Sequence, residues 1–396
     1  MKIGILTFHS QLNYGGVLQC WALQTALEKM GHEVVVIDRW MDKNNWRLNR
    51  NYPNSFWKFS KKTIIRSIIG LGDSRFFKRV KRTRSFLTEK IHLSPYHFYE
   101  WSDAPRDLAV DIIVVGSDQV WNMSWPHSRF YLLEDVPQTL RRIAYAVSIG
   151  MSEIPEEYIS IFIESLKKFE AISCRENEGC EICRKLGFEA MHVLDPTLLI
   201  DTSIWLNSFG IDSNNVDCVQ KKLVCYFLSE SVDVNLPLLV KFSQKNKCKI
   251  VIFVADRQRV QDLRQFPLIQ GRMIDWFKDL YNFLFSDIII YESAGPIEFI
   301  KEHASAKWIL TDSFHSLMFS IIFDKNCRII RPKNTDRKSM FSRIEEISKH
   351  TKGELISESV SEALESLIHD KQVIYDKEWL IKEKKKSTSF LEIHLR

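Results

Sequence analysis

Apolar residues gather in short runs near the start of the chain, and a polar, glycine-containing turn separates the first two runs. Residues 2–8 and 33–37 have the length and composition expected of buried strands. Between them, residues 17–30 repeat apolar positions at helical spacing, and Gly31 follows as a typical C-terminal stop signal. The order strand, turn, helix, strand predicts a βαβ unit and therefore a parallel sheet.

The same alternation continues along the chain. In the first half it predicts strands at residues 111–115, 143–148, 171–174 and 192–194, a helix ending near residue 169 and a helix at 178–186. After about residue 215 it predicts strands at 223–228, 249–254, 308–310 and 328–330 and helices at 296–304 and 314–323. We therefore expect an α/β protein with two Rossmann-like domains facing each other across a cleft. They span residues 1–215 and 216–396, and the second ends in a charged helix at about 382–396.

Composition places the chain among ordinary globular proteins. Of its 396 residues, 45% are hydrophobic and 27% are charged, which excludes a disordered or fibrous chain. The first apolar run is too short for a signal peptide and no window is apolar for long enough to cross a bilayer, so a cytoplasmic location is expected. Cys180 and Cys183 are the only close pair among eight cysteines. Packing on a helix face is favoured for them over a zinc or redox site, and no metal is predicted.

One segment breaks the even distribution of charge. Residues 39–90 hold 15 Lys and Arg against 3 Asp and Glu, a charge of +12, whereas the remaining residues sum to −7. The segment predicts a basic helical insertion over about residues 39–100 of the first domain. Its aromatic residues suit peripheral association with an anionic membrane, and a solvated insertion is the alternative; they are Trp40, Trp46, Phe56, Trp57 and Phe59. No nucleic-acid-binding signature accompanies the charge, so no nucleic acid partner is expected.

The turn after the first predicted strand is a candidate ligand site. It holds Asn13, Gly15 and Gly16, and Gln19 follows in the predicted helix. Glycines at this position would let the backbone approach an anionic or sugar ligand beside the start of a helix. The alternative is a tight turn whose glycines need a positive φ.

A second polar loop follows the predicted strand at residues 111–115. Its sequence is GSDQVWN, in which Asp118 and Asn122 can hydrogen-bond hydroxyl groups and Trp121 can stack on a sugar ring. A capping aspartate and a tryptophan in the core are the alternative. We favour a ligand site, because ligands of such sheets bind at the carboxyl ends of the strands.

A histidine follows a predicted strand of the second domain. Within the sequence TDSFHS at residues 311–316, Ser313 or the preceding aspartate can cap the following helix. His315 then falls in the first helical turn, where it can donate a proton or accept one from a hydroxyl. A histidine satisfied in the core is the alternative. Arg175 ends another predicted strand and could bind a carboxylate or phosphate, or pair with Glu176 or Glu178.

Together these segments resemble the polysaccharide pyruvyl transferase family. GSDQVWN and TDSFH are the most specific of the matching stretches, which are residues 13–24, 111–122, 145–150, 173–176, 193–198 and 311–316. Members of the family resemble GT-B glycosyltransferases in fold. The resemblance implies transfer of a pyruvyl group from phosphoenolpyruvate to a sugar of a surface-polysaccharide precursor, such as a lipid-linked oligosaccharide, usually as a cyclic ketal. It implies no cofactor, because an acid/base group and anion-binding donors are sufficient.

The resemblance also implies roles for individual residues. His315 would be the general acid/base, and the helix start at Ser313 would help to hold the phosphate. Better-understood members carry an arginine at the position of Ser313, so Arg175 and Arg331 are expected to bind the donor instead. The acceptor sugar would meet the two loops of the first domain, at Asn13, Gly15, Gly16, Gln19, Asp118, Trp121 and Asn122. A GT-B-like glycosyltransferase that uses a nucleotide sugar and a non-catalytic family member remain alternatives.

Overall fold

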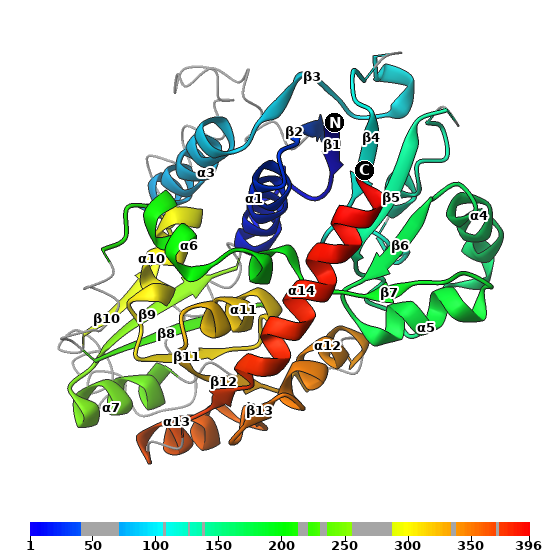
Figure 1. Cartoon of the computed structure of the whole chain (residues 1–396). Helices are drawn as coiled ribbons and strands as arrows, with labels where there is room; N and C mark the ends of the chain where they lie inside the picture. Colours follow the sequence, from blue (N-terminus) through cyan, green and yellow to red (C-terminus); the bar gives the residue numbers. More distant parts are fainter. Residues whose placement is uncertain are drawn as a thin grey trace.

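Two parallel sheets, one from each half of the chain, form the framework of the protein (Figure 1). The computed structural model describes residues 1–40, 71–105, 108–125, 127–136, 139–212, 221–229, 236–255, 287–333, 338–369 and 372–396. All structural statements below concern these residues.

The first sheet has seven parallel strands in the order β3-β2-β1-β4-β5-β6-β7. On either side of β1, Ile3 lies opposite Val34 and Ile112. This is the doubly wound order of a Rossmann-like domain, and the strand order reverses between β1 and β4. The strands are β1 (Lys2–Leu6), β2 (Glu33–Arg39), β3 (Leu93–Phe98), β4 (Ile112–Val115), β5 (Arg141–Val147), β6 (Ala171–Cys174) and β7 (Met191–His192).

The second sheet repeats this arrangement with the order β10-β9-β8-β11-β12-β14. The strand order here reverses between β8 and β11. The prediction of two Rossmann-like domains is thus confirmed, while the boundary predicted near residue 215 lies outside the described residues. The strands are β8 (Lys222–Phe227), β9 (Lys249–Val254), β10 (Ile288–Tyr291), β11 (Trp308–Thr311), β12 (Asn326–Ile330) and β14 (Ile356–Ser357). The strands β13 (Thr351–Lys352) and β15 (Ile374–Tyr375) form a separate antiparallel pair.

Helices pack on both sheets, and the last of them joins the two domains. The predicted terminal helix is α14 (Lys377–His394), which begins earlier than expected because Asp376 caps it. From the second domain it crosses to the first (Figure 1), where the hydroxyl of Ser387 accepts the N–H of Leu194. The other helices are α1 (Tyr14–Lys29), α3 (Leu71–Lys90), α4 (Glu156–Leu166), α5 (Asn177–Lys185), α6 (Thr202–Ser208), α7 (Leu236–Asn246), α10 (Pro296–Ala304), α11 (Phe314–Ile322), α12 (Lys338–Ser348) and α13 (Val360–Ile368). The short 3-10 helices are η3 (Trp101–Asp103), η4 (Ser128–Leu132) and η5 (Pro196–Leu199).

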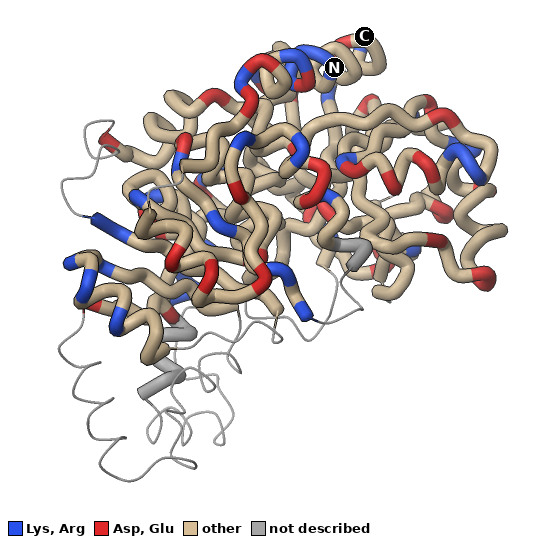
Figure 2. Tube along the Cα trace, turned by 90° about the horizontal axis from the view of Figure 1, so that it is seen from below, with Lys and Arg blue, Asp and Glu red and all other residues tan. Residues whose placement is uncertain are grey.

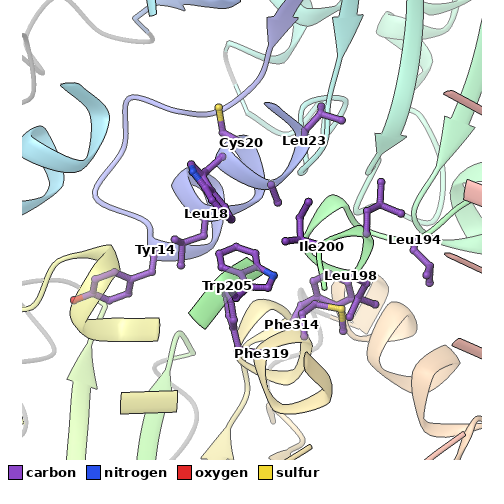
Figure 3. Packing of buried hydrophobic residues seen from close by; sticks show 14 of the residues in the cluster. Tyr14, Leu18, Cys20, Leu23, Leu194, Leu198, Ile200, Trp205, Phe314 and Phe319 are labelled. Carbon is purple, nitrogen blue, oxygen red and sulfur yellow. The ribbon is translucent and has the colours of Figure 1, made fainter. Parts of the chain in front are cut away.

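A continuous apolar core connects the domains. Trp205 of α6 is fully buried, and its ring lies 4.6 Å from that of Trp21 of α1 and 5.1 Å from that of Phe319 of α11. Figure 3 shows this packing between helices of both halves. Because the contact is apolar and dry, it fixes how the two sheets face each other.

The predicted basic insertion is shorter than expected and partly serves the fold. Residues 93–98 form β3 at the edge of the sheet, where Pro95 is tolerated because an edge strand need not donate on both sides. In α3, Arg79 donates to the backbone oxygens of Leu12 and Val254, which belong to different domains. This arginine therefore joins the domains and is not a freely solvated charge.

The aromatic residues proposed for a membrane surface fall into two groups. Trp40 is only 3% exposed and donates its Nε1–H to Asp38, so its prediction as a surface contact is wrong. The remaining four, Trp46, Phe56, Trp57 and Phe59, lie outside the described residues. Along the described chain, positions of both charge signs are interspersed (Figure 2). No described helix has the length and apolar character needed to cross a membrane.

Candidate active site

Loops from both domains meet where the strand order of each sheet reverses. Residues 116–122 follow β4 beside β1, and residues 312–315 follow β11 beside β8. In doubly wound sheets this position is where ligands bind. The charge of His315, from the loop after β11, acts on Asp118, from the loop after β4, so the two loops lie close together. A second contact between the domains is the hydrogen bond that the hydroxyl of Tyr14 donates to the backbone oxygen of Ala294.

Arg175 holds two aspartates in a buried cluster. Its Nη1 donates to Oδ2 of Asp195 and its Nη2 donates to Oδ1 of Asp118, each at 2.9 Å. Asp195 is fully buried and also accepts from the N–H and hydroxyl of Thr197. Both terminal nitrogens of Arg175 donate to carboxylates, while its buried Nε has no hydrogen-bond partner within the described chain, so direct binding of a ligand anion stays a prediction. The alternative of a surface pair is wrong, since the arginine side chain is 1% exposed.

The mutual charges of the cluster set its protonation. Burial alone would raise the pKa of Asp118, but the charges of Arg175, His315 and Arg343 and the N–H of Gln119 lower it below its ordinary value. Burial acts against the charge of Arg175 as well, but the neighbouring carboxylates outweigh it and raise the arginine's pKa. At neutral pH the cluster therefore contains an ionised Asp118 next to a charged Arg175.

His315 completes the cluster from the second domain. Its Nε2 lies 3.8 Å from Oδ2 of Asp195, which is too far for a hydrogen bond, and this buried nitrogen has no other partner within the described chain. Burial lowers the pKa of His315 below its ordinary value; Asp195 and Asp118 oppose this shift, while Arg175 and Arg343 add to it. Buried polar atoms normally have partners, so the unpaired Nε2 makes His315 the strongest candidate for contact with a substrate.

The two glycines of the first loop bring α1 against this histidine. Gly15 and Gly16 lie in the first turn of α1, which begins three residues before the predicted start, and neither has a positive φ. A Cβ at Gly15 would lie 2.1 Å from Nδ1 of His315, and one at Gly16 would lie 3.2 Å from the backbone oxygen of Phe8. The glycines permit close approach, so the alternative of a positive-φ turn is wrong.

Two charged residues of the cluster were not predicted as site residues. Glu176 accepts from the backbone N–H of Ile149, and its Oε2 lies 4.0 Å from Nε of Arg175. Arg343 of α12 places its guanidinium 4.9 Å from the centre of the Phe314 ring. Burial lowers the pKa of Arg343 to about 10, which leaves it charged at neutral pH. Nothing local in the sequence distinguishes Arg343 from other arginines on amphipathic helices.

Several predicted ligand-binding residues instead hold the loops in place. Asn13 caps α1 by accepting the N–H of Gly15, and Ser313 caps α11. Gln19 is fully buried, and its side-chain oxygen accepts the N–H of Ser117, which ties α1 to the loop after β4. These hydrogen bonds position Asp118 and His315, and the predicted ligand contacts of Asn13, Gln19 and Ser313 stay predictions.

The predicted stacking surface at Trp121 is wrong. The indole is fully buried, donates Nε1–H to the backbone oxygen of Tyr131, and packs edge-on against Phe162 and Phe169. Asn122 is also buried and accepts from Ser124, so it shapes the turn. In the GSDQVWN loop, Asp118 is the charged member of the cluster, and Ser117 adds a hydroxyl that donates to Oδ2 of Asp195.

Arg331 lies apart from the cluster. It pairs with Glu345 at 2.7 Å and with Glu358 at 3.1 Å, and its guanidinium lies 4.7 Å from the Phe341 ring. About 40% of its side chain is exposed. Its predicted role in donor binding is therefore not supported, and the cation nearest to His315 from the second domain is Arg343.

Comparison with known proteins identifies the family. The family model of polysaccharide pyruvyl transferases matches residues 13–334, which is most of the chain. A comparison with curated proteins finds no match. Among solved structures, the UDP-GlcNAc 2-epimerase of Methanocaldococcus jannaschii aligns at 16% identity over 95% of this chain and 93% of that one, with a TM-score of 0.50. The enzyme of Neisseria meningitidis bound to UDP-GlcNAc aligns at 11% identity over 100% and 99%, with a TM-score of 0.51.

Identities this low establish the overall fold alone, and they agree with the GT-B-like arrangement expected from the sequence. The family match carries more weight, since it spans the glycine turn, the GSDQVWN loop and the TDSFH loop that meet at the charged cluster. The chain belongs to the polysaccharide pyruvyl transferase family, a family of transferases.

Proposed function

We propose that this protein transfers the pyruvyl group of phosphoenolpyruvate to a sugar of a surface-polysaccharide precursor. One observation supports the proposal most directly. Nε2 of His315 is buried inside a charged cluster between two Rossmann-like domains and has no hydrogen-bond partner within the described chain. A proton donor at this position suits an enol phosphate substrate, whose methylene carbon must be protonated before the adjacent carbon can be attacked.

In the proposed reaction, protonated His315 gives its proton to C3 of phosphoenolpyruvate, and positive charge develops at C2. A sugar hydroxyl attacks C2 and returns its proton to the now neutral imidazole, which restores the starting state of His315. Phosphate then leaves, and a second hydroxyl forms the other bond of the ketal while its proton goes to the departing phosphate. In this proposal Asp118, which is ionised, accepts a hydrogen bond from the attacking hydroxyl and orients it.

The donor carries a carboxylate and a phosphate, so it needs cations and N–H donors. Arg343 supports this role, because it remains charged and lies beside Phe314, the first residue of α11. The open N–H groups at the start of α11 supply further donors for an anion. We propose that Arg343 takes the part that an arginine at the position of Ser313 plays in other members.

A turnover assay tests the proposed reaction. Phosphoenolpyruvate and surface polysaccharide of the source cells, freed of pyruvate ketals by mild acid, should yield inorganic phosphate and a ketal methyl signal in equal amounts. With Arg343→Gln, KM for phosphoenolpyruvate should rise about tenfold or more, and Arg343→Lys should restore part of the loss. Thermal stabilisation by UDP but not by phosphoenolpyruvate would favour a nucleotide-sugar enzyme, and absence of turnover would favour a non-catalytic member.

We further propose that the protein is cytoplasmic and associates with the inner face of the membrane through basic residues of the 39–90 segment. The charge of +12 in that segment is the support for this proposal. Sedimentation with anionic vesicles should be strong at low salt and should fall as salt is added, whereas neutral vesicles should leave the protein in solution. Equal behaviour with both vesicle types would contradict membrane association.

A further inference from the structure

An unassigned groove lies in the first domain, lined by Arg39 at the end of β2, by residues that follow β3 and by residues of and around η4. It consists of two adjoining hollows of about 780 and 620 Å³, each within the size range of ligand pockets, which is about 300–1,000 Å³. Trp101, Ser102 and Asp135 line both hollows, so the two form one elongated depression with Trp101 at its middle. The residues of the catalytic cluster do not line it.

The floor of the groove is a three-layer stack. The ring of Trp101 lies parallel to that of Phe130, with centroids 4.4 Å apart and an interplanar angle of 4°. The guanidinium of Arg39 lies 3.8 Å from the centre of the same Phe130 ring. The Trp101 ring and the Arg39 guanidinium are both too close to share one face of the Phe130 ring, so Phe130 lies between them. The stack holds Trp101 rigidly, which lowers the entropy lost when a ligand binds.

Arg39 offers the groove an unused hydrogen-bond donor. The residue is 3% exposed and lines the larger hollow, and its Nη1 has no partner within the described chain. Its Nε donates to the backbone oxygen of Tyr99. A buried guanidinium with an open nitrogen is costly unless a ligand satisfies it. Around it, Glu100, Ser102 and His127 add acceptors and donors to the same hollow.

The larger hollow is linked to the catalytic cluster by one side chain. Tyr131 hydrogen-bonds Arg39, and burial, together with the charge of Asp118, raises the pKa of Tyr131 to about 12. Tyr131 is thus a neutral hydroxyl that interacts both with Arg39 of the groove and with Asp118 of the charged cluster. The smaller hollow continues from Trp101 along Ala104, Leu108 and Leu140.

We infer that this groove binds the acceptor glycan beyond the sugar that reacts, with Trp101 as the stacking platform and Arg39 as a hydroxyl-binding donor. The inference rests on the proposed function, because it assumes a glycan acceptor. A flat aromatic ring bordered by charged groups of both signs matches a pyranose, which presents an apolar C–H face and a rim of hydroxyls. The elongated shape matches several successive sugars rather than one.

Binding in the absence of phosphoenolpyruvate tests the groove separately from catalysis. The probe is the ketal-free surface polysaccharide of the source cells, cut into oligosaccharides and separated by length. The wild type should bind longer oligosaccharides about tenfold or more tightly than disaccharides, and Trp101→Ala should abolish that difference. Ser102→Trp, which fills the groove at an exposed position, should have the same effect without removing any packed side chain.

Trp379 provides the matched control. Its ring also stacks on an aromatic ring, that of His350, at 4.1 Å and 8°, but it lies in α14 outside the groove. Trp379→Ala should keep the length dependence. Length-independent binding by the wild type, or unchanged binding by both groove variants, would overturn the groove assignment even if pyruvyl transfer is observed. Length-dependent binding without pyruvyl transfer would support the groove and overturn the proposed reaction.

Discussion

Replacing His315 with glutamine should lower kcat by about 10²–10⁴-fold, because glutamine keeps a polar side chain of similar reach but cannot transfer a proton. Nε2 of His315 makes no hydrogen bond within the described chain, so the substitution breaks no hydrogen bond of this nitrogen. Phosphate release from phosphoenolpyruvate measures kcat, and the midpoint of thermal unfolding should stay close to that of the wild type. Full activity in the variant would remove His315 from the mechanism.

The pH profile gives a second reading of the same role. An acid catalyst is active when protonated, and burial lowers the pKa of His315 below its ordinary value of 6.5. In the wild type, kcat/KM should therefore fall as pH rises, with a midpoint below 6.5, and the residual activity of the glutamine variant should lack this decline. A rise of kcat/KM through the same midpoint would assign His315 as a base in the first step.

Gly15 supplies an internal control. Gly15→Ala places a Cβ 2.1 Å from Nδ1 of His315, so the ring must move. A displacement of about 1 Å can cost about 10²-fold in rate. In a His315→Ala background the obstruction is gone, so Gly15→Ala should cost nothing further. Equal losses in both backgrounds would mean that Gly15 acts independently of the histidine.

Replacing Arg175 with methionine should lower the free energy of unfolding by about 3–5 kcal/mol, since it leaves Asp118 and Asp195 buried without their shared cation. Chemical denaturation at several pH values measures the loss. Arg331→Met is the matched control, because Arg331 also joins two carboxylates but does so at the surface. Its loss should be less than about 1 kcal/mol.

The stability that Arg175→Met loses should become smaller as pH falls. In the wild type the folded-state pKa of Asp118 is lowered, so its contribution to stability is present above about pH 4 and is lost as pH falls through the folded value. Without Arg175, burial should raise this pKa, and the folded variant then gains stability on binding a proton. The difference between the two proteins should therefore shrink from about pH 8 to about pH 5. A constant difference would mean that Arg175 stabilises by packing alone.

Much of the fold and part of the site were predictable from local patterns. Buried parallel strands form continuous apolar runs, so β1, β4, β8 and β11 were visible in the sequence, and the polar loops after them fell at the ligand-binding edges. The edge strand β3 was missed because it is half exposed and contains Pro95. His315 was recognisable because it follows both a strand and a capping serine.

The errors share one physical cause, which is that side-chain direction in a loop has no periodicity. Trp121 and Asp118 lie three residues apart in the same polar loop, yet one points into the core and the other into the charged cluster. Arg175 pairs with two aspartates, and Arg343 approaches Phe314. Both contacts join segments that are far apart in the sequence. The pairing of Arg175 becomes visible only when three strand ends of the first domain are placed together, and the approach of Arg343 only when the second domain is added.

The course of α14 has a consequence for biosynthesis. A ribosome completes the strands of the first domain long before it adds Ser387 and Phe390, yet these two residues cover Leu194 and Tyr145 of that domain. Domains usually fold in the order in which they emerge. Here part of the apolar surface of the first domain stays uncovered until α14 has been synthesised. A chain that stops before Ser387 would leave this surface exposed and should therefore be degraded by proteases faster than a chain that contains α14.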